Sequence, residues 1–257
     1  MRPWQTARLG AGVVAIVLVV LAARSAWAYR PFVSTDAAVA DPKEFEIELG
    51  VLTVDRTGRD NTYTAPSVVL NYGLLERWEL IAEFRIQEGS GTDVTDPAVS
   101  LKTVLKEGVL QDKDGLSLAV ETGVLLPSTL KGEGGVGFEA TGLVSGRLGP
   151  LTLHANLGGG VDRSDTRPFV TWGLIGELPV SEKVRLVSEV NGQSTRGRRP
   201  DNAVLLGVIW KPSSSNVFVD AAVRRGISSG APDWEFTAGV TFGFKLPSPP
   251  RPGLGSL

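Results

Sequence analysis

The sequence predicts an all-β fold, a closed antiparallel transmembrane β-barrel of about twelve strands. Segments that alternate apolar and polar residues follow one another along 45–244; in 234–244 every even-numbered residue is apolar and every odd-numbered one is Glu, Thr or Gly. Such alternation gives a strand one apolar and one polar face. Most segments have about ten to twelve residues, which matches the ~9–11 of a tilted membrane strand better than the ~5–6 of a soluble one. The connections alternate between short and long, as at the two rims of an outer-membrane barrel.

The first 28 residues predict a secretory signal that is removed. Arg2 and Arg8 form a basic start, the stretch 9–23 is almost wholly apolar, and Ala26-Trp27-Ala28 has the small-x-small pattern of a cleavage site. A single membrane anchor is the alternative, but the apolar run is shorter than the ~20 residues that a helical span needs. The signal holds three of the 26 basic residues and none of the 28 acidic ones, so cleavage leaves 229 residues with a formal charge of −5.

The composition excludes several function classes. A mildly acidic chain predicts no nucleic-acid partner. The chain has no cysteine and a single histidine, His154, so a disulfide scaffold is excluded, and neither a transition-metal site nor a cofactor is expected. No later stretch approaches 18 apolar residues, so no helix should cross a membrane after processing.

Strands are expected at the twelve windows of period-two alternation. These are 45–54, 62–73, 77–88, 97–106, 115–126, 136–147, 150–162, 168–178, 184–193, 202–211, 216–225 and 233–244. Tight reversals are expected at 74–76, 148–150, 179–183 and 211–216, and looser polar loops at 55–61, 88–96, 127–135, 194–201 and 226–232. The connection 107–115 is long although it falls on the short-turn side. An even strand count puts both ends of the barrel on that side, which we assign to the periplasm.

The two faces of the strands differ in chemistry. The apolar face is expected to meet lipid and includes Ile47, Leu49, Val51, Leu80, Ala82, Phe84, Leu118, Val120, Val124, Leu206, Val208, Trp210, Val217, Val219 and Ala221. The polar face is expected to line the lumen, where the candidate residues are Glu46, Glu48, Glu83, Arg85, Lys102, Glu121, Glu139, His154, Arg185 and Glu189. Charges of both signs there predict either a paired network that braces the interior or a polar conduit with a weak cation preference. A soluble sandwich, with its polar face outward, would show the same alternation.

Aromatic residues gather near both ends of the predicted strands, as in the aromatic girdles of membrane barrels. One group is expected near the periplasmic rim and comprises Tyr72, Trp78, Trp210, Phe242 and Phe244. The other is expected near the opposite rim and comprises Tyr63, Phe138, Trp172 and Trp234. Two such levels suit the two lipid–water interfaces.

Two segments flank the predicted barrel. Residues 29–44 precede the first strand and are expected either in the periplasm or inside the lumen as a plug. Residues 245–257 are rich in proline and are expected to be extended and disordered. The domains predicted are therefore a signal (1–28), an N-terminal segment (29–44), a barrel (45–244) and a tail (245–257).

The start of the mature chain carries a family resemblance. Arg30-Pro31-Phe32-Val33-Ser34-Thr35-Asp36-Ala37 leads through Pro42 to Phe45-Glu46-Ile47-Glu48-Leu49-Gly50. This stretch resembles the opening of a widespread group of bacterial outer-membrane barrels, regarded as transporters and related to the barrel family of the phenol meta-cleavage pathway. The resemblance implies a passive channel for small solutes, among them hydrophobic or aromatic compounds, and supplies no catalytic residues. Barrels of this kind end on an aromatic read by the barrel-assembly machinery; Phe244 fits, although the chain continues beyond it.

Two alternatives to a channel stay open: a structural barrel with a plugged lumen, and a lipid-modifying enzyme. Outer-membrane phospholipase A is a twelve-stranded barrel with Ser, His and Asn on its lipid-facing side. By parity with Thr152 and Asn156, His154 instead faces the lumen, and no Gly-x-Ser-x-Gly elbow occurs. We therefore expect no enzyme activity.

One further contact is expected at the outer surface. The basic run that contains Arg196, Arg198 and Arg199 lies in a predicted outer loop. Guanidinium groups bind phosphate well, so these arginines could contact lipopolysaccharide, although a solvated loop would have the same composition. The partners expected overall are outer-membrane lipid, lipopolysaccharide, the assembly machinery and a small solute.

Overall fold

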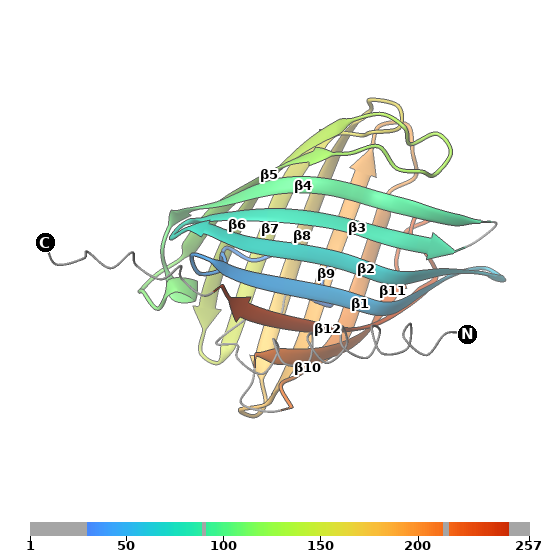
Figure 1. Cartoon of the computed structure of the whole chain (residues 1–257). Coiled ribbons are helices and arrows are strands. Elements are labelled where there is room, and N and C mark those ends of the chain that lie inside the picture. Colours follow the sequence, from blue (N-terminus) through green and yellow to red (C-terminus); the bar gives the residue numbers. More distant parts are fainter. Residues whose placement is uncertain (1–29, 89–90, 213–215, 247–257) are drawn as a thin grey trace, which may run out of the picture.

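The computed structural model describes residues 30–88, 91–212 and 216–246, and these form a closed barrel of twelve antiparallel strands (Figure 1). Each strand pairs with its neighbours in the chain, and β1 pairs with β12 to close the sheet. Closure leaves no unpaired edge, which a strand in hydrocarbon could not tolerate. The strands are β1 (Glu44–Thr57), β2 (Asp60–Leu75), β3 (Trp78–Glu88), β4 (Thr92–Lys106), β5 (Ser117–Leu125), β6 (Gly137–Leu148), β7 (Leu151–Val161), β8 (Pro168–Pro179), β9 (Val184–Thr195), β10 (Asp201–Trp210), β11 (Val217–Gly226) and β12 (Trp234–Lys245).

The predicted fold class and strand count are confirmed, and each predicted window overlaps one strand. The predicted signal (1–28) and the end of the tail (247–257) lie outside the described residues. In the part of the chain that the structure describes, no helix is long and apolar enough to span a membrane.

Two outer loops were predicted too long. The polar stretch 55–61 was assigned to a loop, but β1 and β2 remain paired up to Thr57 and Asp60, leaving only Gly58 and Arg59 between them. The stretch 88–96 is likewise mostly strand, because β4 begins at Thr92. Polar residues continue these strands because both faces of a hairpin that projects beyond the lipid meet water. Polarity therefore marks the edge of the membrane here and not the end of the strand.

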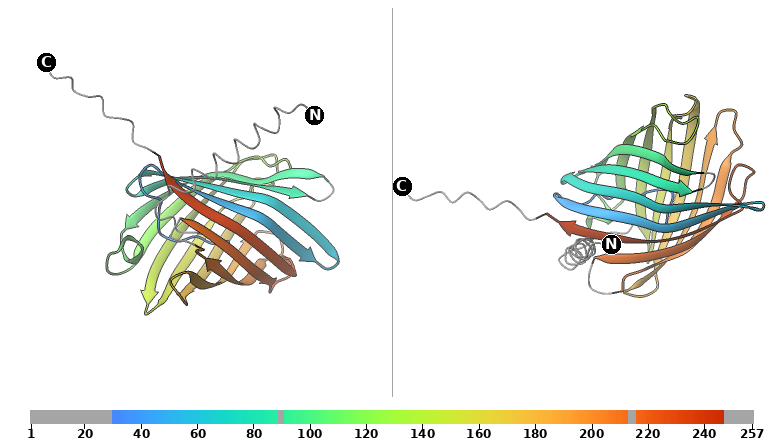
Figure 2. Two further views of the ribbon diagram at one scale, coloured as in Figure 1. Left: turned by 60° about the horizontal axis from the view of Figure 1, so that its bottom comes forward. Right: turned by 45° about the vertical axis from the view of Figure 1, so that its right-hand side comes forward.

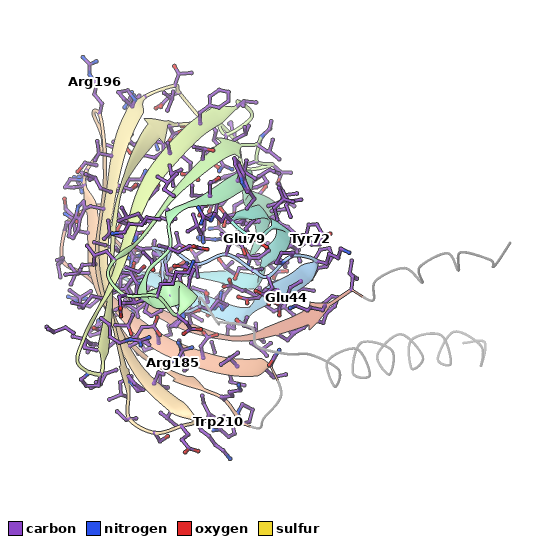
Figure 3. All side chains as sticks on the ribbon, turned by 90° about the vertical axis from the view of Figure 1, so that its left-hand side faces the viewer. Glu44, Tyr72, Glu79, Arg185, Arg196 and Trp210 are labelled. Carbon is purple, nitrogen blue, oxygen red and sulfur yellow. The ribbon has the colours of Figure 1, made fainter. Side chains whose placement is uncertain are left out.

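The two rims of the barrel differ less than predicted, because the connection 58–59 on the predicted loop side is as short as the turns of the opposite rim. One rim carries short turns such as 76–77 and 149–150, together with the two ends of the barrel, and is called the short-turn rim below. Its exception is the connection 107–116, which includes a short 3-10 helix, η1 (Val109–Gln111). The other rim is called the loop rim; the turned views of Figure 2 show its longer connections. In Figure 3, Arg196 marks the loop rim and Trp210 marks the short-turn rim.

The two faces of the strands are separated as the alternation predicts. On β10, Leu205 is 0% exposed and faces inward, whereas its neighbour Leu206 is 65% exposed and faces outward. Several aromatic residues of both predicted girdles are exposed, among them Trp78 and Trp210 near the short-turn rim and Trp234 near the loop rim. An exposed apolar belt on a closed barrel is what a lipid-facing surface requires.

The buried core lies inside the barrel and includes the segment before β1. One apolar cluster on the inner wall joins Val187, Ile209 and Phe218, and Phe32 packs against it. A second cluster joins Ala119 and Leu143 to Ala37, which is fully buried. Residues 30–43, called the lumenal segment below, therefore supply apolar contacts that the strands alone would lack.

Candidate functional site

The lumenal segment runs along the inner wall of the barrel and does not stand in its centre as a cork. It starts at Arg30 beside β11 and β12, passes β9, β7 and β6 in turn, and ends at Lys43, whose N–H donates to the carbonyl of Gly73 on β2. Most of its anchors are side chains of the wall that bind its backbone. The segment therefore follows the inside of the wall past most of the strands and narrows the lumen.

Glu189 is the central anchor. Its carboxylate accepts hydrogen bonds from the backbone N–H groups of Val33 (2.9 Å) and Ser34 (2.8 Å), and the residue is 1% exposed. Hydrogen bonds to an ionised acceptor are stronger than those between neutral groups. Glu189 was predicted to line the lumen; it does face inward, but it lies beneath the lumenal segment.

A second anchor holds Thr35. Asn156 accepts from the Thr35 N–H (2.9 Å) and donates its amide to the Thr35 carbonyl (2.7 Å), while the Lys102 ammonium donates to the Thr35 hydroxyl (2.9 Å). Lys102 is itself held between Glu79 (3.6 Å) and Glu121 (3.7 Å). A buried ammonium needs such partners, because an unpaired charge away from water is costly.

The end of the lumenal segment is held near the short-turn rim. The Ala37 N–H donates to the Ser145 hydroxyl (3.1 Å), the Gln111 side chain donates to the Ala37 carbonyl (3.0 Å), and the Ala40 N–H donates to Glu79 (2.8 Å). Gln111 belongs to η1, so the one long connection on this rim secures the segment. The segment leads directly into β1, whose first residue is Glu44.

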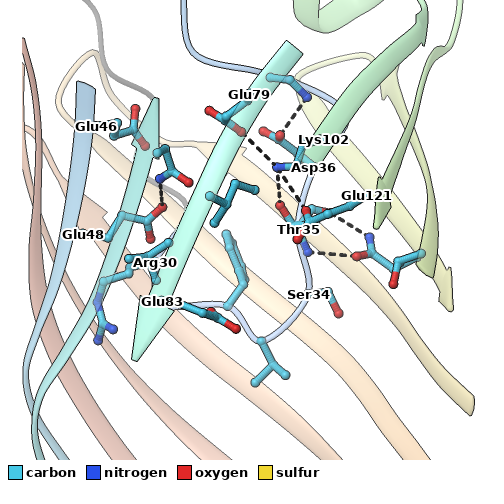
Figure 4. Close-up of a pocket in the computed structure, with 18 of the residues that line it drawn as sticks. Arg30, Ser34, Thr35, Asp36, Glu46, Glu48, Glu79, Glu83, Lys102 and Glu121 are labelled. Carbon is cyan, nitrogen blue, oxygen red and sulfur yellow. Dashed lines mark hydrogen bonds and ion pairs between the residues drawn. The ribbon is translucent and has the colours of Figure 1, made fainter. Parts of the chain in front are cut away.

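A cavity of about 760 Å³ lies beside the lumenal segment and is called the main cavity below. Its lining extends from Glu76, in the turn at the short-turn rim, to Asp201, the first residue of β10 at the loop rim. Thirteen acidic and four basic residues line it, the basic ones being Arg30, Arg85, Lys102 and Arg224. Figure 4 shows Glu46, Glu48, Glu79, Glu83 and Glu121 around the segment. The space that the segment leaves open is therefore strongly acidic.

The predicted lumen residues divide into three groups. Seven line the main cavity, namely Glu46, Glu48, Glu83, Arg85, Lys102, Glu121 and Glu139. His154 and Arg185 line a second cavity of about 410 Å³ beside the turn 149–150. Glu189 lines neither. Some of these charges are paired: Arg85 lies 3.5 Å from Asp96, and Glu48 accepts a hydrogen bond from Asn71 (3.1 Å). The cavity as a whole keeps an excess of acidic groups.

Sequence reasoning missed two kinds of functional residue. Glu79 shares the parity of Glu83 on β3, so the alternation could have identified it. Arg30 and Asp36 precede the first strand, where no periodicity applies, and only the folded chain places them in the lumen. In the described ranges no group of three or more His, Asp or Glu residues is placed to hold a metal ion.

Ser145, His154 and Glu177 form a buried hydrogen-bonded chain. The Ser145 hydroxyl lies 2.8 Å from His154 Nδ1, and His154 Nε2 lies 3.1 Å from Glu177, which also pairs with Arg185 (2.7 Å). These residue types occur in hydrolase triads. Here Ser145 is 0% exposed and already accepts the Ala37 N–H, so a substrate cannot reach its oxygen. The arrangement supports a bracing role.

Replacing His154 by alanine is expected to destabilise the barrel without removing an activity. The change leaves Ser145 and Glu177 without their shared partner and opens a void, at a cost of about 1–3 kcal/mol in the free energy of unfolding. Urea unfolding in detergent micelles measures this cost. A lipase assay on the two proteins should show no activity in either, and lipid hydrolysis that depends on His154 would contradict the bracing role.

The three arginines proposed to contact lipopolysaccharide are all exposed beyond the end of β9. Arg198 pairs with Asp162 (3.3 Å) and Asp165 (3.1 Å) in the outer connection between β7 and β8, so it joins two outer connections. Burial raises the pKa of Asp162, but bonds from Ser164 and the Arg198 charge outweigh it and hold the pKa below its usual range. The Arg198–Asp162 ion pair is therefore present at neutral pH and is lost as acid protonates Asp162 below that range.

Comparisons with known proteins bear on the fold. Neither protein-family models nor curated protein sequences match the chain. Among solved structures, it is similar to the COG4313 outer membrane channel from Pseudomonas putida F1, with 11% identity and a TM-score of 0.54 over 80% of this chain and 97% of that one. It is also similar to the KdgM porin, with 8% identity and a TM-score of 0.53 over 77% of this chain and 98% of that one. At these identities the likeness establishes a shared barrel fold.

Proposed function

We propose that the protein is a passive channel of the bacterial outer membrane that prefers small cations. The observation that carries this proposal is the main cavity, whose lining extends from one rim to the other past the lumenal segment. Its thirteen acidic and four basic side chains favour cations over anions. The exposed apolar belt supports a place in lipid, and both solved barrels to which the chain is similar are named as channels or porins.

The chemistry of the lining narrows the choice of solute. The KdgM porin is described in complex with oligogalacturonate, a sugar polymer with a carboxylate on each unit. Such a polyanion would be repelled by the acidic main cavity. The resemblance at the start of the chain implies hydrophobic or aromatic solutes, and apolar side chains such as Phe32, Val39 and Ile81 in the lining support this finer proposal. A cation with an apolar body combines both features.

The two alternatives are less well supported. A structural barrel with a plugged lumen requires that the lumenal segment block the passage, and the cavity of about 760 Å³ beside the segment favours a route past it. A lipid-modifying enzyme requires an accessible nucleophile, and the Ser145 hydroxyl is buried under Ala37.

Cation preference is tested by the reversal potential of the refolded protein in a planar bilayer under a KCl gradient. A unit charge about 7 Å away in water contributes about 0.6 kcal/mol, which is roughly a threefold factor in local cation occupancy. Glu83→Gln and Glu139→Gln should each lower the ratio of potassium to chloride permeability by up to this factor. The effect should weaken at high salt because charges are then screened.

The matched control is Glu182→Gln, which removes the same charge from the exposed turn between β8 and β9, outside the main cavity. It should leave the permeability ratio close to that of the unaltered protein. Two results would overturn the proposed function. One is anion preference in the unaltered protein, and the other is no current from protein whose gel migration changes on boiling, as that of a folded barrel does.

A further inference from the structure

Arg30, the first described residue, places its guanidinium in a recess of the barrel wall. Its Nη1 donates to the Ser67 hydroxyl on β2 (3.1 Å) and its Nη2 to the Thr237 hydroxyl on β12 (2.8 Å). Its Nε lies 3.5 Å from an oxygen of Asp220 on β11. Thr237 is in turn within 3.1 Å of the Thr53 hydroxyl on β1. Four strands therefore contribute to this recess.

Two glycines form the floor of the recess. Gly50 and Gly239 face each other across the β1–β12 pair, and both approach the Arg30 side chain. A Cβ atom at Gly50 would lie 2.6 Å from Arg30 Nη1, and one at Gly239 would overlap the guanidinium at Nε. Real Cβ atoms do not come so close, so a side chain at either position would enter the space that the guanidinium occupies. The wall is thus shaped to admit a flat group.

Asp220 supplies the charge of the recess. It is 2% exposed, and among the described residues neither of its oxygens accepts a hydrogen bond within normal limits. Arg30 is the ion-pair partner that the structure records for it. A buried carboxylate with so few donors is strongly disfavoured unless a cation lies against it. Asp220 therefore stays ionised only with a cation against it, and Arg30 supplies that cation in the structure.

We propose that this recess is a guanidinium-binding site, occupied by Arg30 in the structure, that also binds solutes bearing a guanidinium group. Arg30, Ser67 and Glu48 all line the main cavity, so a solute in the lumen can reach it. The planar guanidinium presents donors on three nitrogens, which suits two hydroxyls and a carboxylate around a flat floor. An ammonium is a compact point charge and cannot span these partners. The proposal rests on the channel function for the route of access, and it names a class of cation that the channel would take.

Competition between a solute and Arg30 follows from the proposal. A guanidinium solute that enters the recess displaces the first described residue of the lumenal segment, while Glu189 and Asn156 still hold the next residues. Occupation by solute and occupation by Arg30 exclude each other. The affinity of the recess for a solute is therefore reduced in the unaltered protein by the presence of its own arginine.

The test uses the whole protein refolded in detergent, the variant Arg30→Ala, and methylguanidinium as the probe. Calorimetric titration should show methylguanidinium binding at least about tenfold more tightly to Arg30→Ala than to the unaltered protein, because the competing side chain is gone. Methylammonium, of equal charge, should bind at least about tenfold more weakly than methylguanidinium. Adding Asp220→Asn to Arg30→Ala should abolish the preference.

Folding is checked on the same samples by heat-modifiable gel migration. If Arg30→Ala refolds poorly alone, methylguanidinium but not methylammonium should raise its yield, since it restores the cation beside Asp220. Equal effects of the two probes, or binding unchanged by Asp220→Asn, would overturn the proposal. Binding in detergent does not require conduction, so binding without bilayer current would contradict the channel and leave the guanidinium site standing.

Discussion

A variant that lacks residues 30–41 is expected to conduct several times more current in a planar bilayer than the intact barrel. Removing the lumenal segment joins its volume to the main cavity, and conductance rises with the cross-section of the narrowest part. The wall should survive, because the twelve strands pair with one another independently of the segment. Glu189 and Lys102 would lose partners from the segment but would then face water, which lowers the cost. Single-channel recording gives the conductance, and gel migration before and after boiling checks the fold.

A disulfide between the segment and the wall distinguishes two routes for ions. Ions could pass beside the segment while it stays in place, or only after the segment has left the lumen. The chain has no cysteine, and Ala37 and Ala119 belong to one buried cluster, so Ala37→Cys with Ala119→Cys is the pair chosen to link the segment to the wall. If ions pass through the main cavity, the oxidised double variant should conduct like its reduced form. A current that disappears on oxidation would show that the segment must leave, and a deletion variant with unchanged conductance would contradict the role of the segment in narrowing the lumen.

Replacing Leu206 by arginine is expected to destabilise the folded barrel by about 2–4 kcal/mol, the cost of an arginine at the lipid-facing midplane of a membrane barrel. Leu206 lies in the middle of β10, faces outward and is 65% exposed, so the new charge would enter hydrocarbon. Chemical unfolding in lipid vesicles measures the free energy. The effect should depend on depth, because an arginine nearer either rim can extend its charge to the interface.

The matched control places the same side chain on the other face of the wall. Thr141 on β6 lines the main cavity and pairs across the sheet with Glu121, so Thr141→Arg puts the new cation in an acidic aqueous space. It should change the free energy of unfolding by less than about 1 kcal/mol. Equal costs for the two arginine variants would refute the assignment of the outer face to lipid.

The fold could be predicted from the sequence because its main signal is local. Side chains of a strand alternate between faces with period two, so the parity of Glu46, Glu83 and Glu139 placed them inward without knowledge of any partner. The outer hairpins were the weak point. The polarity of a residue indicates whether it meets water, but it does not indicate where strand pairing ends. β1 and β2 therefore stay paired up to Thr57 and Asp60 although these residues are polar.

The sequence predicted which residues line the candidate site but not how they are arranged around the lumenal segment. The sequence indicated which charged side chains face the lumen, and it left the position of residues 29–44 open between the periplasm and the lumen. His154 illustrates the difference: parity placed it inside, but its partners Ser145 and Glu177 are set by the register of three strands.

By itself the sequence determined a closed membrane barrel with an apolar exterior and a charged interior, because both follow from alternation repeated along the strands. Only the tertiary structure decided that the lumenal segment lies along the inner wall, that an acidic cavity stays open beside it, and that Arg30 fills a recess of glycines, hydroxyls and Asp220. Arg30 and Thr237 are 207 residues apart in the chain. Contacts at that separation exist only once the last strand closes the barrel, so no local pattern can encode them.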